Sequence, residues 1–163
     1  MSPILPRRKG TGGLDVTFSQ YLLLLNGPNL NRLGLREPEI YGTETLDDVV
    51  RRVEAVATRH GVGVRAFQSN SEGALIDRLQ ADGPGALGII INPGALAHYG
   101  YSLRDCLADV NRPTIEVHIS NVHRREAFRH QLVLAPVVTG QIVGLGTLGY
   151  ALAAEALLRK PGE

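Results

Sequence analysis

The stretch Tyr21–Asn31 reads YLLLLNGPNLN and carries the strongest fold signal in the chain. It begins with a continuous apolar run, without the alternation of a half-buried strand, which predicts a strand buried on both faces. The Asn-Gly-Pro at positions 26–28 ends this strand, because these residues favour turns. Strands buried on both faces are typical of parallel sheets covered by helices, so the stretch predicts an α/β fold.

The rest of the chain alternates between short apolar runs and helical patterns. Thr45 is suited to cap a helix that begins at Leu46 and ends at Gly61. Further strands are predicted at 62–67, 87–91, 114–117 and 141–143. Further helices are predicted at 71–80, 102–110 and 145–160, with one or two helical turns at 124–129. Strands alternating with helices in this way predict a doubly wound five-stranded parallel sheet in the flavodoxin-like order 2-1-3-4-5.

Length and composition predict a single globular domain. The chain has 163 residues, of which 44% are hydrophobic and 20% charged, near the globular average. Residues 1–20 are rich in proline, glycine and basic residues and are expected to form a disordered tail, so the domain is expected to span 21–163. The basic cluster at 7–9 is followed by glycine and threonine rather than by the apolar segment of a signal peptide, which favours a cytoplasmic protein.

The charged and cysteine residues exclude several classes of function. Seventeen Lys and Arg residues against sixteen Asp and Glu residues give no electrostatic reason to expect a nucleic-acid or membrane partner. No apolar run approaches the ~20 residues of a membrane span. The single cysteine, Cys106, excludes an intramolecular disulfide and any multi-cysteine metal site. Lys9 and Lys160 are the only lysines, which disfavours Schiff-base catalysis within the domain.

Polar residues follow four of the predicted strands, at 26–31, 68–70, 92–94 and 118–121. The carboxyl ends of parallel strands meet at one edge of the sheet, where ligands bind at the point of strand-order reversal. Turn chemistry explains any one of these ends, since Asn, Ser and Gly favour turns. Their combination favours a site for a ligand rich in hydroxyl and carboxylate oxygens.

Two further stretches have a predicted role. The residues at 144–149 match GxGxxG, but they follow the last predicted strand, so close helix–sheet or subunit packing explains them better than dinucleotide binding. The connection at 31–43 is long for a strand-to-helix link and borders the expected site. It is expected to be a mobile lid, the alternative being a plain surface loop.

Several ordered motifs resemble those of the type II 3-dehydroquinate dehydratases. They are LNGPNLN at 25–31, Arg36-Glu37-Pro38 with Tyr41-Gly42, QSNSEG at 68–73, Asn92-Pro93-Gly94 with His98, and EVHISN at 116–121 with Arg125, Phe128 and Arg129. The resemblance covers about residues 21–158. It implies the flavodoxin-like fold, no cofactor, no metal, and a homododecamer built as a tetramer of trimers. The implied reaction converts 3-dehydroquinate to 3-dehydroshikimate, in the shikimate pathway or in quinate breakdown.

The resemblance also implies the catalytic groups. Tyr41 would be the base; ionising a free tyrosine at pH 7 costs roughly 4 kcal/mol, and the guanidinium of Arg36 would lower the phenol pKa. Asn29 would position the water that hydrogen-bonds the developing enolate. His118 would be the acid that protonates the leaving hydroxyl, with Glu116 on the same strand face orienting its ring.

A second implied set of groups holds the substrate. The backbone N–H groups of Ile119 and Ser120 would bind its carboxylate. The side chains expected at its ring hydroxyls are Asn92, His98 and Arg129. Asp105 would reach a site hydroxyl from a neighbouring subunit, which would make the trimer necessary for full activity. Tyr99-Gly100-Tyr101 departs from the small hydroxyl residues of the family pattern at the helix start after His98.

Three other functions remain as alternatives. A receiver domain would need acidic residues where the first and third strands end, but both ends carry asparagine. A flavin carrier would need a Ser/Thr-rich phosphate loop after the first strand. A metal-dependent hydrolase would draw on His98, Asp105, His118 and His123, which lack the His-x-x-x-His spacing of helical metal ligands.

Overall fold

The computed structural model describes residues 18–35, 39 and 43–159, and within them five strands form one parallel sheet. The strand order is β2-β1-β3-β4-β5, which confirms the predicted flavodoxin-like order. The strands are β1 (Tyr21–Asn26), β2 (Gly63–Gln68), β3 (Gly88–Asn92), β4 (Thr114–His118) and β5 (Gly140–Val143). The longer helices are α2 (Leu46–Arg59), α3 (Glu72–Asp82), α4 (Tyr101–Val110) and α5 (Leu148–Leu158).

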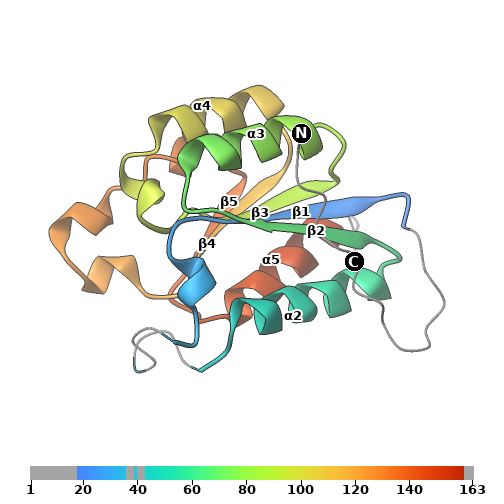
Figure 1. Ribbon diagram of the computed structural model, residues 1–163, viewed down its shortest axis with the longest axis horizontal. Helices are drawn as coiled ribbons and strands as arrows, with labels where there is room; N and C mark the ends of the chain where they lie inside the picture. Colours follow the sequence, from blue (N-terminus) through green and yellow to red (C-terminus); the bar gives the residue numbers. More distant parts are fainter. Residues whose placement is uncertain (1–17, 36–38, 40–42, 160–163) are drawn as a thin grey trace.

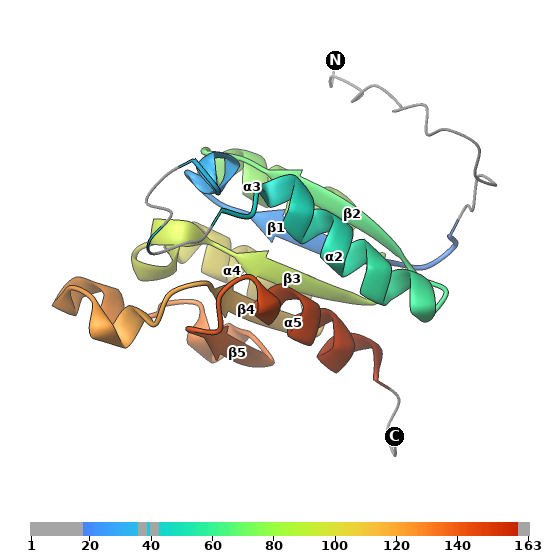
Figure 2. The ribbon, with the colours of Figure 1, turned by 90° about the horizontal axis from the view of Figure 1, so that it is seen from below.

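The helices cover both faces of the sheet. In Figure 1, α3 and α4 lie above the sheet and α2 and α5 lie below it. Figure 2, seen from below, shows α2 and α5 side by side across the strands. No helix in the described part of the chain is long and apolar enough to span a membrane.

The strand β1 lies in the middle of this sandwich, between β2 and β3. Leu22 and Leu24 belong to the core on the side of α2 and α5, and Leu23 and Leu25 belong to the core on the other side. All four side chains are fully buried, as the continuous apolar run predicts. Burying apolar surface on both faces is the main source of stability for such a strand.

The predicted cap of α2 is confirmed. The Thr45 hydroxyl accepts a hydrogen bond from the Asp48 backbone N–H at 3.2 Å, and the Asp48 carboxylate accepts one from the Thr45 N–H at 2.9 Å. This reciprocal pair is a capping box, which satisfies two N–H groups that the helix leaves free. The helix α4 is capped from outside instead: Glu72 Oε1 accepts a hydrogen bond from the Leu103 N–H at 3.1 Å.

The start of the last helix was predicted wrongly. The expected helix at 145–160 begins only at Leu148 and ends at Leu158. Gly144 and Gly146 have φ values of 85° and 63°, in the left-handed region, so the chain is still a turn there. Gly149 explains part of the glycine run: a Cβ atom would lie 3.1 Å from Ile142 Cγ2 and 3.2 Å from Val117 Cγ1. The predicted close helix–sheet packing is therefore present.

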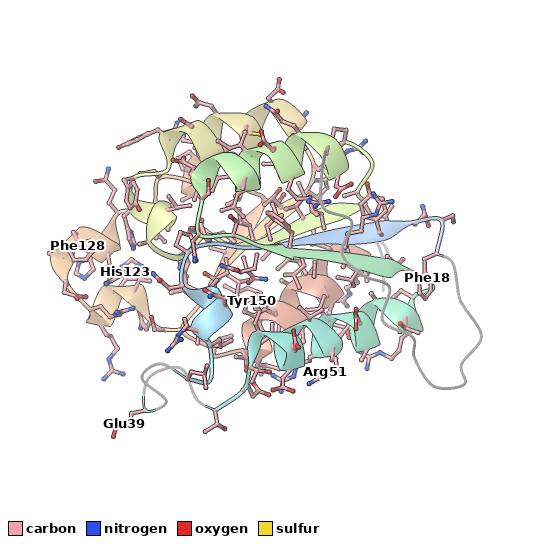
Figure 3. The ribbon with its side chains drawn as sticks, viewed as in Figure 1. Phe18, Glu39, Arg51, His123, Phe128 and Tyr150 are labelled. Carbon is pink, nitrogen blue, oxygen red and sulfur yellow. The ribbon has the colours of Figure 1, made fainter. Side chains whose placement is uncertain are left out.

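The predicted tail overlaps only slightly with the described residues, since 1–17 lie outside them. Near its end, Phe18 packs beside β2: a Cβ atom on Gly63 would lie 3.1 Å from the Phe18 side chain (Figure 3). The Gly63 N–H also donates a hydrogen bond to Gln20 O at 2.9 Å. Of the predicted tail, the described residues Phe18 and Gln20 thus contact the domain. The 1–20 and 21–163 boundary stays a prediction.

Asp48→Asn tests the capping box through its pH dependence. Hydrogen bonds from the Thr45 hydroxyl and backbone, with Arg51 beside them, lower the pKa of Asp48 from 3.8 to about 2. A pKa lowered by folding means that ionised Asp48 stabilises the protein above pH 3.8, and this contribution is lost as the pH falls through about 2. The urea midpoint of Asp48→Asn should be below that of the parent at pH 7, and the two should converge toward pH 2. Asp47→Asn, which removes a charge from the same turn outside the capping box, should show the smaller difference; equal differences at both pH values would contradict the assignment.

Candidate active site

A cavity of about 170 Å³ lies at the carboxyl ends of β1, β3 and β4. The carboxyl end of β1 points to the left in Figure 1. Its walls come from the loop after β1, the segment after β3, and the end of β4 with the two 3₁₀ turns that follow. Those turns are η3 (Val122–Arg124) and η4 (Ala127–His130), close to the predicted helical turns at 124–129. The described lining residues are Pro28, Asn29, Leu30, Arg32, Leu33, Asn92, Gly94, Ala95, His98, His118, Ile119, Ser120, Val122, Arg125 and Arg129.

The ends of β1 and β3 approach each other closely beside this cavity. The Gly27 N–H donates to Asn92 O at 2.8 Å, and a Cβ atom at Gly27 would overlap the carbonyl group of Pro93. Gly94 has a φ of 58°, and a Cβ atom there would lie 3.0 Å from Pro28 O. Glycine is therefore required at both positions, because a side chain would push the two strand ends apart.

Asn29 is held at the mouth of the cavity by a neighbouring strand end. Its φ of 70° lies in the left-handed region, which a residue other than glycine seldom adopts. Its backbone N–H donates to Asn70 Oδ1 at 2.9 Å, and Gln68 Nε2 donates to the same oxygen at 3.1 Å. The polar residues after β2 thus fix the loop after β1, which keeps the Asn29 conformation in place.

His118 is braced by two residues behind it. Glu116 Oε1 lies 2.7 Å from His118 Nε2, so this nitrogen carries a proton and donates it to the carboxylate. The other carboxylate oxygen accepts a hydrogen bond from Gln141 Nε2 on β5, also at 2.7 Å. Glu116 is completely buried and His118 is 6% exposed. The pairing of Glu116 with His118 was expected from their spacing, whereas the contact with Gln141 was not.

His98 reaches the cavity from the segment after β3. Its Nδ1 lies 2.9 Å from the carbonyl oxygen of Gln131. A carbonyl only accepts, so Nδ1 carries the proton and Nε2 is the nitrogen left for a ligand. The ring of Phe128 meets the His98 imidazole edge-on, with 5.9 Å between the ring centroids.

The electrostatic character of the lining is basic. Arg32, Arg125 and Arg129 contribute guanidinium groups, and no Asp or Glu is among the described lining residues. Arg125 Nη1 donates to Ser120 Oγ at 3.3 Å, and Arg129 Nε donates to Glu126 Oε2 at 2.8 Å. Such a lining favours an anionic ligand that also offers hydroxyl groups.

The structure brings together most of the site residues expected from the sequence. Those that line the cavity are Asn29, Asn92, His98, His118, Ile119, Ser120 and Arg129, and Glu116 lies behind His118. Asp105 is exposed on α4 and does not line the cavity of its own chain. Arg36 and Tyr41 lie outside the described residues.

The connection that carries Arg36 and Tyr41 begins and ends beside the cavity. Its first described part includes the lining residues Arg32 and Leu33. A Cβ atom at Gly34 would lie 2.9 Å from Thr43 O and 3.0 Å from the carbonyl oxygen of the next residue, so the two ends of the connection meet. Most of the intervening residues lie outside the described part of the chain, so the lid stays a prediction.

Two residues at the site, Arg32 and Tyr150, were not predicted from the sequence. Arg32 lines the cavity, but nothing in its local sequence distinguished it from other loop arginines. Tyr150 contacts Asn92 from α5, a helix that was read only as apolar core. Among the described residues, no three His, Cys, Asp or Glu side chains lie close enough to hold a metal ion, so the set considered for a hydrolase is not assembled.

Comparison with known proteins yields consistent matches. A family model described as class II dehydroquinase matches residues 20–158. The 3-dehydroquinate dehydratase of Roseiflexus castenholzii is 59% identical over 142 residues, which cover 87% of this chain and 90% of that protein. The 3-dehydroquinate dehydratase of Anoxybacillus flavithermus is 58% identical over 136 residues, covering 83% and 92%. The crystal structure of a type II dehydroquinase from Butyrivibrio crossotus has a TM-score of 0.83 and 48% identity, covering 86% of this chain and 98% of that chain.

Gly27→Ala tests the close approach at the site. The added methyl group must displace the Pro93 carbonyl, so we expect the free energy of unfolding to fall by about 3 kcal/mol. Gly73→Ala is the matched control, since a Cβ atom there meets only Ser71 Oγ at 3.8 Å within α3. It should raise stability by about 0.5 kcal/mol, because alanine favours the helix. Urea denaturation of both variants provides the measurement, and equal small effects would show that the strand ends separate easily.

Proposed function

Because this chain belongs to the class II dehydroquinase family and dehydrates 3-dehydroquinate, we propose that it does so by an anti elimination through an enolate. A base removes a proton alpha to the ketone, and the C–H electron pair forms the enolate. As the ketone re-forms, the C–O bond of the beta hydroxyl breaks and the oxygen leaves as water after protonation by an acid. The observation that carries the proposal is the braced His118 facing a basic cavity at the sheet edge.

His118 is the acid in this scheme. Its Nε2–H is engaged by Glu116, so the proton for the leaving hydroxyl comes from Nδ1. The buried carboxylate fixes the ring and balances the charge of the doubly protonated imidazole. Gln141 holds the second carboxylate oxygen, which keeps Glu116 from turning away.

Tyr41 is the base, with Arg36 as the fixed positive charge that favours its phenolate. This assignment rests on the family motif and on chemistry, since both residues lie outside the described part of the chain. A guanidinium keeps its proton at any working pH and therefore acts only as a charge. The described ends of their connection meet beside the cavity, which supports their access to it. Asn29 positions the water that hydrogen-bonds the enolate oxygen.

The remaining lining groups hold the substrate. The backbone N–H groups of Ile119 and Ser120 bind the carboxylate, and the basic lining supports this choice of an anion. The ring hydroxyls meet the side chains of Asn92, His98 and Arg129, with His98 offering Nε2. Neither a cofactor nor a metal takes part in the elimination as written.

We place the enzyme in the shikimate pathway of the cytoplasm and in a homododecamer built as a tetramer of trimers. The exposed position of Asp105 on α4 supports a role in the site of a neighbouring subunit. Leu145, Leu148 and Leu152 are large apolar side chains exposed around the start of α5, which is typical of surfaces that subunits cover.

Incubation of the protein with 3-dehydroquinate tests the activity directly. The conjugated enone of 3-dehydroshikimate should accumulate, observed by its ultraviolet absorbance, without any added cofactor. Turnover should be unchanged after treatment with EDTA, and borohydride added with substrate should not inactivate the protein. Absence of product would overturn the activity. Loss of turnover on chelation would instead favour the metal-dependent alternative.

Tyr41→Phe and Arg36→Ala test the proposed base. Each should lower kcat by about 10²–10⁴-fold, the usual contribution of general base catalysis, while circular dichroism and melting stay those of the parent. Tyr101→Phe is the matched control, since Tyr101 is exposed on α4 and does not line the cavity. A kcat for Tyr41→Phe within a few-fold of the parent value would remove the tyrosinate from the mechanism.

A further inference from the structure

Three buried polar side chains from different elements meet behind the cavity. Tyr150 on α5 is fully buried, Asn26 at the end of β1 is 1% exposed, and Asn92 at the end of β3 is 4% exposed. Tyr150 Oη lies 2.8 Å from Asn26 Oδ1 and 2.7 Å from Asn92 Nδ2. Figure 3 shows Tyr150 in the interior of the molecule, near the sheet. Polar groups are costly to bury unless they are hydrogen-bonded, and these three side chains satisfy one another.

The hydrogen bonds of the cluster have only one consistent direction. The Gly94 backbone N–H donates to Asn92 Oδ1 at 3.1 Å, so the oxygen of this amide faces Gly94. The nitrogen then faces Tyr150 and donates to the phenol oxygen. Because Asn26 Oδ1 accepts, the single phenol proton is donated to it. Turning the Asn92 amide over would set its Nδ2 against the Gly94 N–H, so that two donors face each other. Turning the Asn26 amide over would remove the oxygen that accepts the buried phenol proton.

This direction decides what Asn92 offers to a ligand. An asparagine amide has nearly the same shape after a 180° rotation, which exchanges its donor and acceptor. Asn92 lines the cavity, and its Nδ2 has a second proton beyond the one given to Tyr150. Tyr150 keeps its own proton at working pH, because burial raises the pKa of the phenol. The cluster therefore holds the amide in a single orientation.

We propose that Tyr150 is a positioning residue that fixes the side-chain amide of Asn92 for a substrate hydroxyl. The inference rests on the proposed role of Asn92 in substrate binding. Tyr150 reaches Asn92 because α5 packs close to the sheet at Gly149, where a Cβ atom would press on Ile142 and Val117. Since Asn92 holds a hydroxyl in both the ground state and the transition state, its disturbance should raise KM more than it lowers kcat.

Steady-state kinetics of Tyr150→Phe with 3-dehydroquinate test the proposal. KM should rise about tenfold, which corresponds to the loss of one hydrogen bond between Asn92 and the substrate, while kcat changes by less than about threefold. Tyr21→Phe is the matched control: Tyr21 Oη donates to Asp82 O at 2.7 Å, at the other end of β1. It should lower the melting temperature and leave KM unchanged.

A double-mutant cycle separates positioning from a merely structural role. In an Asn92→Ala background, Tyr150→Phe should have no further effect on KM, because the group that it positions is gone. Effects on KM that multiply in the double variant, or an unchanged KM in Tyr150→Phe alone, would overturn the inference. If Tyr150→Phe does not fold, Asn26→Ala takes its place. It removes the acceptor of the phenol proton and should raise KM by a similar factor, and an unchanged KM would again overturn the inference.

The same measurements distinguish this inference from the proposed function. A parent protein that does not turn over 3-dehydroquinate contradicts the proposed function itself. Turnover by the parent with an unchanged KM in Asn92→Ala contradicts the role of Asn92, and the inference fails with it. A raised KM in Asn92→Ala with a parental KM in Tyr150→Phe contradicts the inference alone.

Discussion

The close approach of β1 and β3 at their carboxyl ends is the constraint on which the site depends. Gly27 donates to Asn92 O and leaves no room for a side chain against Pro93. From these two neighbouring strands the chain leaves toward opposite faces, into α2 below the sheet and α4 above it (Figure 1). The connections diverge there, which opens a cavity in any doubly wound sheet. The polar groups of the site gather at this point because the topology provides it.

The fold was predictable where a signal is local and strong. The apolar run in β1 can be satisfied only by burial on both faces. The capping box of α2 is equally local, because Thr45 and Asp48 lie within one helical turn of each other. The start of α5 was not predictable in the same way. Residues 144–149 read GLGTLG. Whether a glycine in such a run continues a helix or turns left-handed depends on tertiary packing that the local sequence does not show.

The site residues likewise divide into those that local sequence predicts and those that depend on long-range contacts. The pairing of Glu116 with His118 follows from the two-residue period of a strand, and the lining residues at the strand ends follow from the parallel topology. Gln141 and Tyr150 are different, because each reaches its partner across a long stretch of chain, 25 residues to Glu116 and 58 residues to Asn92. Such contacts exist only once the sheet order is set. The proposed role of Asp105 is harder still to predict from the sequence, because the site that it would serve belongs to another subunit.

The glycine run at 144–149 is visible in the local sequence, but its role depends on tertiary packing. It matches a phosphate-binding pattern, yet Gly149 is used for contact: its missing Cβ lets α5 lie against Ile142 and Val117. That depth of packing lets the next residue, Tyr150, cross to the end of β3 and bond Asn92. A side chain at Gly149 would push α5 away from the sheet, and the Tyr150 phenol would then move away from the Asn92 amide. Helix packing on one face of the sheet thus determines which hydrogen-bonding group faces the cavity at the sheet edge.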